Sequence, residues 1–266
     1  MKQLFHITND QVVDKEMALL CEIGEQYFSI GEHIMDRKHI HTLSYFTFSH
    51  PVTPEMLRDV LNQHFHRAYT KVLVGVGFPQ VSIVPDSFFG KTDLKLFFPE
   101  LPPRTMLLHD AIEEWRLVAG YSLPDEIHRF FKMQDVPVHF QHVFTTELKI
   151  YNGFVAGEQI SVHFTPQQFR VMVKKQGQLQ LAQMYAYATP LDVVYYLLKI
   201  MEAFQLPKEE TFCILSGLIE RDSSLYRELE NYFLNLHFTH PAVTITENEH
   251  PHHFFTSLFN LAACAS

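Results

Sequence analysis

The chain has 266 residues, of which 47% are hydrophobic and 19% are charged, and its formal net charge is −9. This composition provides enough apolar sequence for a large buried core, whereas the negative charge and the singly spaced basic residues disfavour a nucleic-acid partner. No apolar run approaches the roughly 20 residues that cross a bilayer, and Met1–Asp14 is polar without the apolar core of a signal peptide. We therefore expect a cytoplasmic protein that does not insert into a membrane.

Residues 17 to 84 have the pattern of an antiparallel strand meander that runs into an amphipathic helix and then into a buried strand. Gly75 and Gly77 end this pattern at a turn before Pro79. Because no third glycine opens a helix there, the turn is not a dinucleotide-binding fingerprint. The expected elements are strands at Leu19–Ile23, Tyr27–His33, His41–Phe48 and Val72–Val76, and a helix at Thr53–Tyr69.

The next segment predicts a small inserted α/β subdomain. Phe88–Pro103 is rich in Phe, Pro and Gly, so we expect a loop-rich passage that covers apolar surface. Core packing is favoured over an exposed adhesive patch for its phenylalanines, which are Phe88, Phe89, Phe97 and Phe98. The other expected elements are a hairpin of Met106–Ala111 and Trp115–Tyr121, and helices at Pro124–Met133 and Val143–Phe154.

Residues 158 to 236 repeat the order of the first segment. The expected strands are Gln159–Thr165, Phe169–Lys174, Gln178–Tyr187 and Thr211–Leu218, with a helix that opens at Thr189. The C-terminal stretch predicts a strand at Ala242–Ile245 and an apolar helix at Phe254–Ala263, joined by the charged segment Glu247–His253. Two copies of one pattern indicate a duplicated α/β architecture.

Cysteines and histidines offer candidate metal ligands, but their spacing disfavours a site. Cys21 and Cys213 fall in apolar strand patterns and Cys264 near the end of the chain, so all three are expected to be unpaired. His39 and His41 would share a strand face, whereas His64 and His66 would point to different sides of a helix. We expect no metal site, and we expect the group of His250, His252 and His253 to be solvated.

Common catalytic motifs are missing from the sequence, which contains no GxSxG, HExxH or GxxxxGK pattern. The carboxylate pairs Glu113–Glu114 and Glu209–Glu210 are adjacent in sequence, so their side chains would not converge on one helix face. We interpret both pairs as solvated surface charge, and no catalytic residue is predicted.

Three stretches and the repeated order of elements carry resemblances to known families. Thr189–Leu198, followed by Leu215-Ser216-Gly217 and Leu225–Leu229, looks like the bacterial domain-of-unknown-function family 3822. The order of three strands, a helix and a strand, given twice, is similar to the ribonuclease-H-like halves of the actin, Hsp70 and sugar-kinase ATPase superfamily, which includes pilus-assembly and secretion platform proteins. This resemblance implies an α/β fold of two such halves, with mixed sheets flanked by helices. The implied boundaries are residues 1–85 and 158–266 for the halves and 86–157 for the insertion.

The superfamily's nucleotide motifs are altered in this chain. Its first hairpin signature is Asp-x-Gly-Thr or Ser, and the corresponding residues here are Glu22-Ile23-Gly24-Glu25-Gln26. The second hairpin reads His163-Phe164-Thr165-Pro166, with neither the carboxylate nor the glycine, and Gly217 alone stands for the adenosine-contacting glycine pair.

The resemblance therefore implies a degenerate ATPase fold that works without catalysis or a cofactor, as a cytoplasmic scaffold or adaptor for a protein partner or for self-association. The alternative is a nucleotide-binding ATPase or a small-molecule sensor that uses Glu22, Gly24 and Gly217 in the cleft between the lobes.

Overall fold

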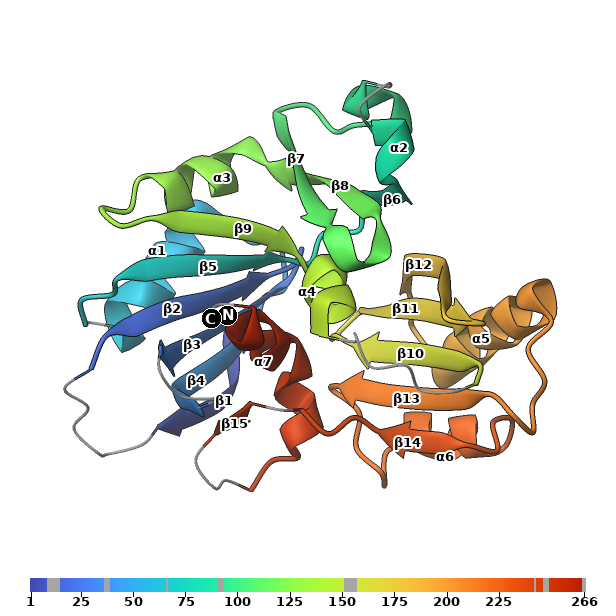
Figure 1. Cartoon of the computed structure of the whole chain (residues 1–266). Coiled ribbons are helices and arrows are strands. Elements are labelled where there is room, and N and C mark those ends of the chain that lie inside the picture. Colours follow the sequence, from blue (N-terminus) through green and yellow to red (C-terminus); the bar gives the residue numbers. More distant parts are fainter. Residues whose placement is uncertain are drawn as a thin grey trace. The chain divides into compact units, whose positions relative to one another are not determined.

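The computed structural model describes residues 1–8, 15–35, 39–65, 67–89, 93–150, 157–241, 243–245 and 249–264. Its contacts divide the chain into two compact units (Figure 1). Unit 1 comprises Met1–Asn152, Ala242–Asn248 and Ser257–Ser266, and unit 2 comprises Gly153–Pro241 and Glu249–Thr256. The predicted α/β class with mixed sheets and flanking helices is confirmed. The boundaries at residues 85 and 157 stay predictions.

Unit 1 is built on a seven-stranded sheet in the order β1-β4-β3-β2-β5-β9, with β15 paired beside β4. The predicted meander is confirmed, because β2, β3 and β4 pair antiparallel, and β5 and β9 then extend the sheet parallel to β2. The strands are β1 (Lys2–Thr8), β2 (Met17–Ile23), β3 (Tyr27–Ile34), β4 (His39–Thr47), β5 (Lys71–Val76), β9 (Val138–His142) and β15 (Thr244–Ile245).

Helix α1 (Pro54–His64) connects β4 to β5 and buries Leu57 and Val60 against the sheet. The Thr53 hydroxyl caps its first turn by accepting a hydrogen bond from the N–H of Met56. The prediction that this helix continues to Tyr69 is wrong. Phe65 adopts an extended conformation and is buried in the core, so the helix stops one residue earlier.

The insertion forms a three-stranded antiparallel sheet, β6-β8-β7, from β6 (Val81–Pro85), β7 (Thr105–Ile112) and β8 (Leu117–Pro124). The predicted hairpin of β7 and β8 is confirmed, although β8 starts at Leu117 and not at Trp115. A 3-10 turn at Glu113–Trp115 and a left-handed Arg116 (φ 54°) make the connection. The helices of this region are α2 (Asp86–Phe89), η1 (Leu94–Phe97), α3 (Asp125–Lys132) and α4 (Val143–Ile150).

The passage Phe88–Pro103, predicted to be loop-rich, contains the end of α2 and the short turn η1. Its phenylalanines divide between core and surface, with Phe98 buried and Phe88 60% exposed. The last residues of the predicted helix Val143–Phe154 lie outside the described part of the chain, in which α4 ends at Ile150.

Unit 2 has a five-stranded sheet in the order β12-β11-β10-β13-β14. Here again an antiparallel meander, β10 to β12, precedes a helix and a strand parallel to the first, β13. A capping box between Thr189 and Asp192 starts α5 (Pro190–Phe204). The other elements are β10 (Gln159–Phe164), β11 (Gln168–Lys175), β12 (Gln178–Ala186), β13 (Phe212–Gly217), α6 (Ser224–Glu230) and β14 (Leu236–Phe238).

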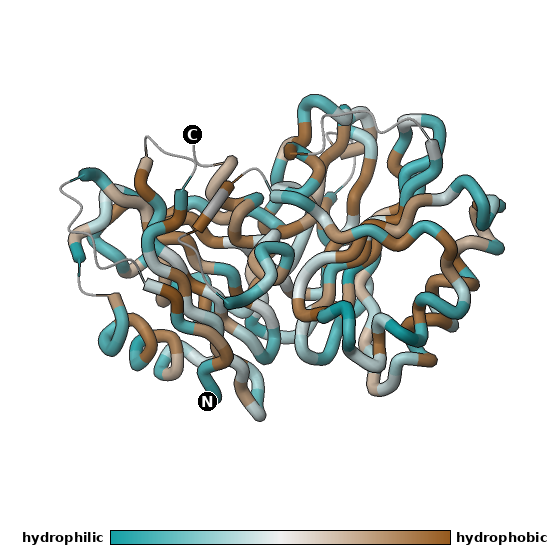
Figure 2. Tube along the Cα trace, turned by 90° about the horizontal axis from the view of Figure 1, so that it is seen from below, coloured by the Kyte–Doolittle hydropathy of each residue, from teal (hydrophilic) through white to brown (hydrophobic). Residues whose placement is uncertain are grey.

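Apolar residues follow the strands and the inner sides of the helices in both units (Figure 2). One hydrophobic cluster fills the space between the unit 1 sheet and helices α1 and α3, and a second lies between the unit 2 sheet and helices α5 and α6. Within the residues described above, no helix is both long and apolar enough to span a bilayer.

The C-terminal stretch contains η3 (His252–Phe255) and α7 (Thr256–Ala263), and the predicted strand is reduced to β15, with Ala242 outside the described residues. The expectation that His253 is solvated is wrong. Its side chain is buried, its Nε2 lies 2.8 Å from the carbonyl oxygen of Ile219, and its ring stacks on Phe238 at 4.1 Å. Packing against an aromatic ring decides its position in spite of the polar sequence around it.

Candidate functional site

The turn between β2 and β3 brings Glu22 and Gly24 together at the carboxyl ends of two parallel strands. Gly75 of β5 pairs with Glu22 across the ladder, and Gly77 follows immediately after β5. Ligands of α/β sheets commonly bind at such strand ends. Glu22 is only 3% exposed, and its Oε1 accepts a 2.9 Å hydrogen bond from the Tyr27 hydroxyl.

Tyr27 fills the space beside this turn. A Cβ atom added to Gly24 would lie 2.1 Å from Cε1 of Tyr27, and one added to Gly77 would lie 2.3 Å from its hydroxyl oxygen. Both glycines are therefore required by the tyrosine that lies against them. Tyr27 is itself buried and stacks on Tyr45 with a centroid distance of 5.7 Å and an interplanar angle of 7°. The side chains of the chain itself thus occupy the inside of the turn.

Helix α7 covers the same face of the sheet. A Cβ atom at Gly75 would lie 3.5 Å from Leu261 and 3.6 Å from Cγ of Glu22, and one at Gly31 would lie 3.1 Å from Leu258. Leu258 and Leu261 are buried. The C-terminal helix therefore adds to the closure of the region around Glu22.

Gly217 belongs to unit 2, so the three residues of the predicted nucleotide set are divided between the two units. It ends β13 with a φ of 76°, and a Cβ atom there would lie 2.1 Å from the carbonyl oxygen of Phe164. This close backbone approach and the left-handed conformation explain why position 217 is a glycine, and no ligand is needed to explain it.

The second hairpin uses its polar groups internally. His163 Nδ1 lies 2.9 Å from the Ser216 hydroxyl, and Thr165 donates a 2.8 Å hydrogen bond to the carbonyl oxygen of Gln168. Burial, and to a smaller extent the charge of Arg170, hold the pKa of His163 well below its usual value. His163 is consequently a neutral, buried side chain near pH 7.

Comparison with known proteins identifies the family. The family model "Protein of unknown function (DUF3822)" matches residues 7–236. The chain belongs to this family. Among curated proteins no match is found.

Two solved structures place this DUF3822 chain in a fold. A protein of Bacteroides thetaiotaomicron, described as having an actin-like ATPase fold and unknown function, matches with a TM-score of 0.77 and 16% identity, over 96% of this chain and 100% of that one. A structure of the PilM-PilN type IV pilus biogenesis complex matches with a TM-score of 0.64 and 11% identity, over 93% and 98% of the two chains. The predicted actin-like ATPase fold is confirmed.

The candidate metal ligands considered from the sequence do not form a cluster in the described part of this DUF3822 structure. No group of three or more His, Cys, Asp or Glu side chains that could hold a metal ion occurs among the described residues, which do not include His66. His41 is buried beside Arg67, at 3.4 Å from the guanidinium nitrogen. Cys21 and Cys213 are buried free thiols, and Cys264 is half-buried and free.

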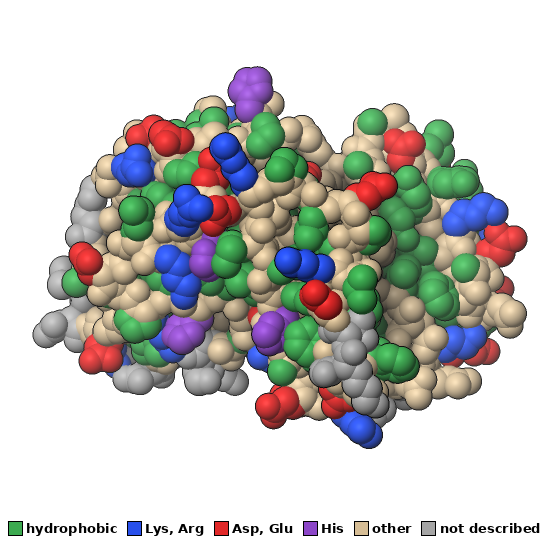
Figure 3. Space-filling view, turned by 90° about the horizontal axis from the view of Figure 1, so that it is seen from above, with side chains coloured by type: hydrophobic (Ala, Val, Ile, Leu, Met, Phe, Trp, Pro, Cys, Tyr) green, Lys and Arg blue, Asp and Glu red, His purple; other side chains and the backbone are tan. Residues whose placement is uncertain are grey.

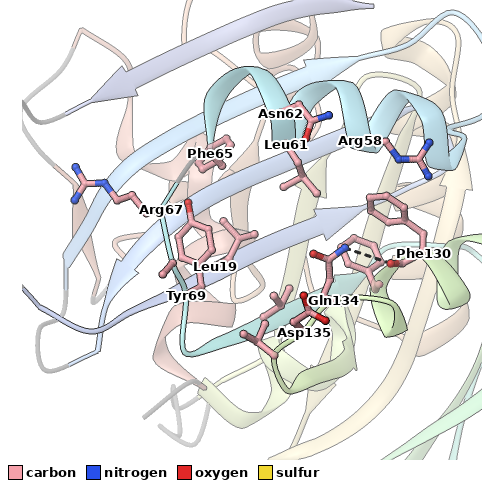
Figure 4. Close-up of a pocket in the computed structure, with 14 residues that line it drawn as sticks. Leu19, Arg58, Leu61, Asn62, Phe65, Arg67, Tyr69, Phe130, Gln134 and Asp135 are labelled. Carbon is pink, nitrogen blue, oxygen red and sulfur yellow. Dashed lines mark hydrogen bonds between the residues drawn. The ribbon is translucent and has the colours of Figure 1, made fainter.

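A surface groove of about 590 Å³ lies in unit 1 between α1 and the end of α3 (Figure 4). Leu19, Phe65 and Val72 form its apolar floor, near the amino ends of β2 and β5 and thus at the opposite end of these strands from Glu22. Arg58 and Gln134 belong to its polar rim. Sequence reasoning missed this groove, because its lining comes from segments as far apart in the chain as Leu19 and Val136.

Proposed function

We propose that this DUF3822 chain is a cytoplasmic binding scaffold or adaptor that does not hydrolyse nucleotide. The observation that carries the proposal is the hydrogen bond between the Tyr27 hydroxyl and the buried Glu22 carboxylate. A Mg²⁺ ion retains several waters and needs an accessible carboxylate. Tyr27 and Glu22 instead form a hydrogen bond with each other inside the turn. Leu261 lies close to Gly75, the residue of β5 that pairs with Glu22.

The structural relatives support binding as the activity. The PilM structure was solved as a complex with PilN, which is an assembly role on a scaffold of the same fold. A protein partner for the present chain is a proposal by analogy with that complex. On the face of the molecule in Figure 3, basic side chains are interspersed with acidic ones, an arrangement without the basic stripe that nucleic-acid binding requires.

The groove between α1 and α3 is the proposed partner site of unit 1. Its apolar floor and polar rim are the anatomy of a recognition site. The Arg58 guanidinium lies 5.9 Å from the centre of the Phe130 ring at one end of the groove, and Gln134 donates a hydrogen bond to the carbonyl oxygen of Phe130. These contacts hold the rim in place while the charged head of Arg58 stays exposed to a partner.

The first test is a thermal-shift titration with Mg²⁺-ATP, Mg²⁺-ADP and Mg²⁺-GTP, with Mg²⁺ alone as the blank. Ligands that bind only the folded state raise its melting temperature. We expect no shift for the wild-type protein at millimolar nucleotide. A saturable shift of a few degrees that is lost in Glu22→Gln would overturn the proposal and support the alternative, in which Glu22, Gly24 and Gly217 serve a nucleotide or small-molecule site.

A variant sharpens this test. Tyr27→Phe removes the hydroxyl that binds Glu22, and Tyr45→Phe removes the hydroxyl of its stacking partner and serves as the matched control. If the Tyr27–Glu22 contact is what closes the turn, only Tyr27→Phe can open it. Any nucleotide-dependent shift of the melting temperature is then expected in Tyr27→Phe and not in Tyr45→Phe.

A further inference from the structure

Strand β12 is an unprotected sheet edge. In the described chain it pairs only with β11, so the other side of its backbone presents unpaired N–H and C=O groups. Its nine residues, QLQLAQMYA, include no charged residue and no proline. Natural edge strands usually carry such residues, or are very short, because they would otherwise pair with another chain.

The other sheet edges show what β12 lacks. β1 carries Lys2, β6 ends in Pro85, and β7 is tied to β9 by the hydrogen bond from the His142 N–H to Asp110. β14 is only three residues long, and β9 is five residues long and contains two histidines. The protection is therefore missing at one edge in particular.

Exposed aromatic and aliphatic side chains continue from this edge onto α5. Tyr185 of β12 stacks on Tyr196 with a centroid distance of 4.4 Å, and the Tyr196 ring lies 5.6 Å from that of Tyr195. Tyr195 and Leu191, one helical turn apart, are each 58% exposed. Tyrosine-rich apolar surface beside an open strand edge is typical of a protein interface.

We propose that β12 is a self-association surface, on which a second copy of this chain adds its own β12 in antiparallel orientation. An uncharged strand meets no like-charge repulsion when it pairs with itself. Antiparallel pairing across a two-fold axis is isologous and closes as a dimer. The partner is thus a second copy, and the result is one continuous sheet through two unit 2 sheets.

The register of the proposed β12–β12 pair follows from the position of the irregularity in this strand. A register shift in the β11–β12 ladder falls at Gln180, so the regular part of the edge is Leu181–Ala186. With Gln183 on the axis, each Leu181 faces the Tyr185 of the other copy, and the two exposed Gln183 side chains meet each other. Aliphatic–aromatic cross-strand pairs and amide hydrogen bonds both favour this arrangement.

The test is the oligomeric state of the full chain by analytical ultracentrifugation over a range of micromolar concentrations. We expect a concentration-dependent dimer for the wild type. Gln183→Lys and Gln183→Glu each place like charges on the axis and should give monomers, and an equimolar mixture of the two should restore the dimer. Gln178→Lys, an exposed glutamine of the same strand before the shift, is the matched control and should remain dimeric.

A monomeric wild type, a dimer that persists in Gln183→Lys, or a mixture that stays monomeric would each overturn the proposal. If Gln183→Lys fails to fold, Tyr195→Lys on the exposed side of α5 replaces it, with an expected rise in the dissociation constant of about tenfold or more.

The register of the dimer is checked with Gln183→Cys, because opposite residues of antiparallel strands lie within disulfide reach. Oxidised glutathione should therefore cross-link Gln183→Cys and leave Gln178→Cys uncrosslinked. Nucleotide binding does not enter any of these readouts, so the inference stands or falls independently of the proposed function.

Discussion

The Asp110 carboxylate accepts a 2.7 Å hydrogen bond from the backbone N–H of His142, and this contact joins the inserted sheet to the end of the main sheet of unit 1. The other carboxylate oxygen accepts a hydrogen bond from the Tyr121 hydroxyl. Asp110, Tyr121 and His142 are all buried. The insertion is therefore fixed to the sheet through a shared buried acceptor.

Asp110→Ala is expected to lower the free energy of unfolding by about 2 to 4 kcal/mol, because two buried donors lose their acceptor. Asp110→Asn keeps one carbonyl oxygen and should cost less. Asp86→Ala removes an exposed carboxylate 4.0 Å from Arg116 and should change stability by less than about 1 kcal/mol. Urea denaturation of the three variants measures these differences, and equal losses for Asp110→Ala and Asp86→Ala would contradict the role of the shared acceptor.

Gly217→Ala should be among the most damaging glycine substitutions in the chain. Its Cβ would meet backbone atoms of Phe164, and alanine is strained at a φ of 76°. We expect a loss of about 3 kcal/mol. Gly75→Ala is the control, because its Cβ would make only ordinary contacts with Leu261 and Glu22. Comparable melting temperatures for the two variants would contradict this account.

Gly77 and Tyr27 should be energetically coupled. In Gly77→Ala the new methyl group meets the Tyr27 hydroxyl oxygen, so the variant should be destabilised by about 1 to 3 kcal/mol. Tyr27→Phe removes that oxygen and should relieve part of the loss. A double-mutant cycle measures the coupling, and strict additivity would show that the hydroxyl does not occupy the space beside Gly77.

Stability is expected to fall in acid because of buried histidines. Burial lowers the pKa of His163 well below its ordinary value of 6.5, and it lowers the pKa values of His33, His41 and His253 as well. The unfolded chain therefore binds more protons than the folded chain below pH 6.5. The contribution of these neutral histidines to the free energy of unfolding is complete above that pH. It is lost as the pH falls towards the folded-state pKa, by up to about 1.4 kcal/mol per pH unit for each histidine.

Urea denaturation between pH 7 and about pH 5 tests this dependence. In His163→Asn the slope of stability against pH should decrease by the share of one histidine. Parallel curves for the wild type and the variant would show that His163 does not titrate on unfolding.

The sequence predicted the two antiparallel meanders, the helix and strand that follow each, and the approximate position of the turn, because apolar periodicity and glycines are local signals. It did not predict where α1 ends, since the burial of Phe65 depends on distant partners. β9 was missed because His139, Gln141 and His142 interrupt the apolar pattern of a strand that pairs on one side only.

The role of Tyr27 at the candidate site was equally out of reach. Glu22 and Gly24 are adjacent in sequence to the turn and were identified from it, but the contact of Tyr27 with Gly77 joins residues fifty positions apart. Burial of His253 also depends on its stacking with Phe238, a residue of β14 that no local sequence pattern connects to it. Sequence periodicity places side chains on a face, and the fold decides what they meet there.

The two buried thiols give each unit its own internal reporter. Cys21 lies in the hydrophobic cluster of unit 1 and Cys213 in that of unit 2, and burial raises the pKa of both, that of Cys213 to about 12. A thiol reagent reaches neither until the surrounding core opens. The alkylation rates of the two cysteines, followed separately by mass spectrometry, therefore measure how often each half of the molecule opens, without any label having been introduced.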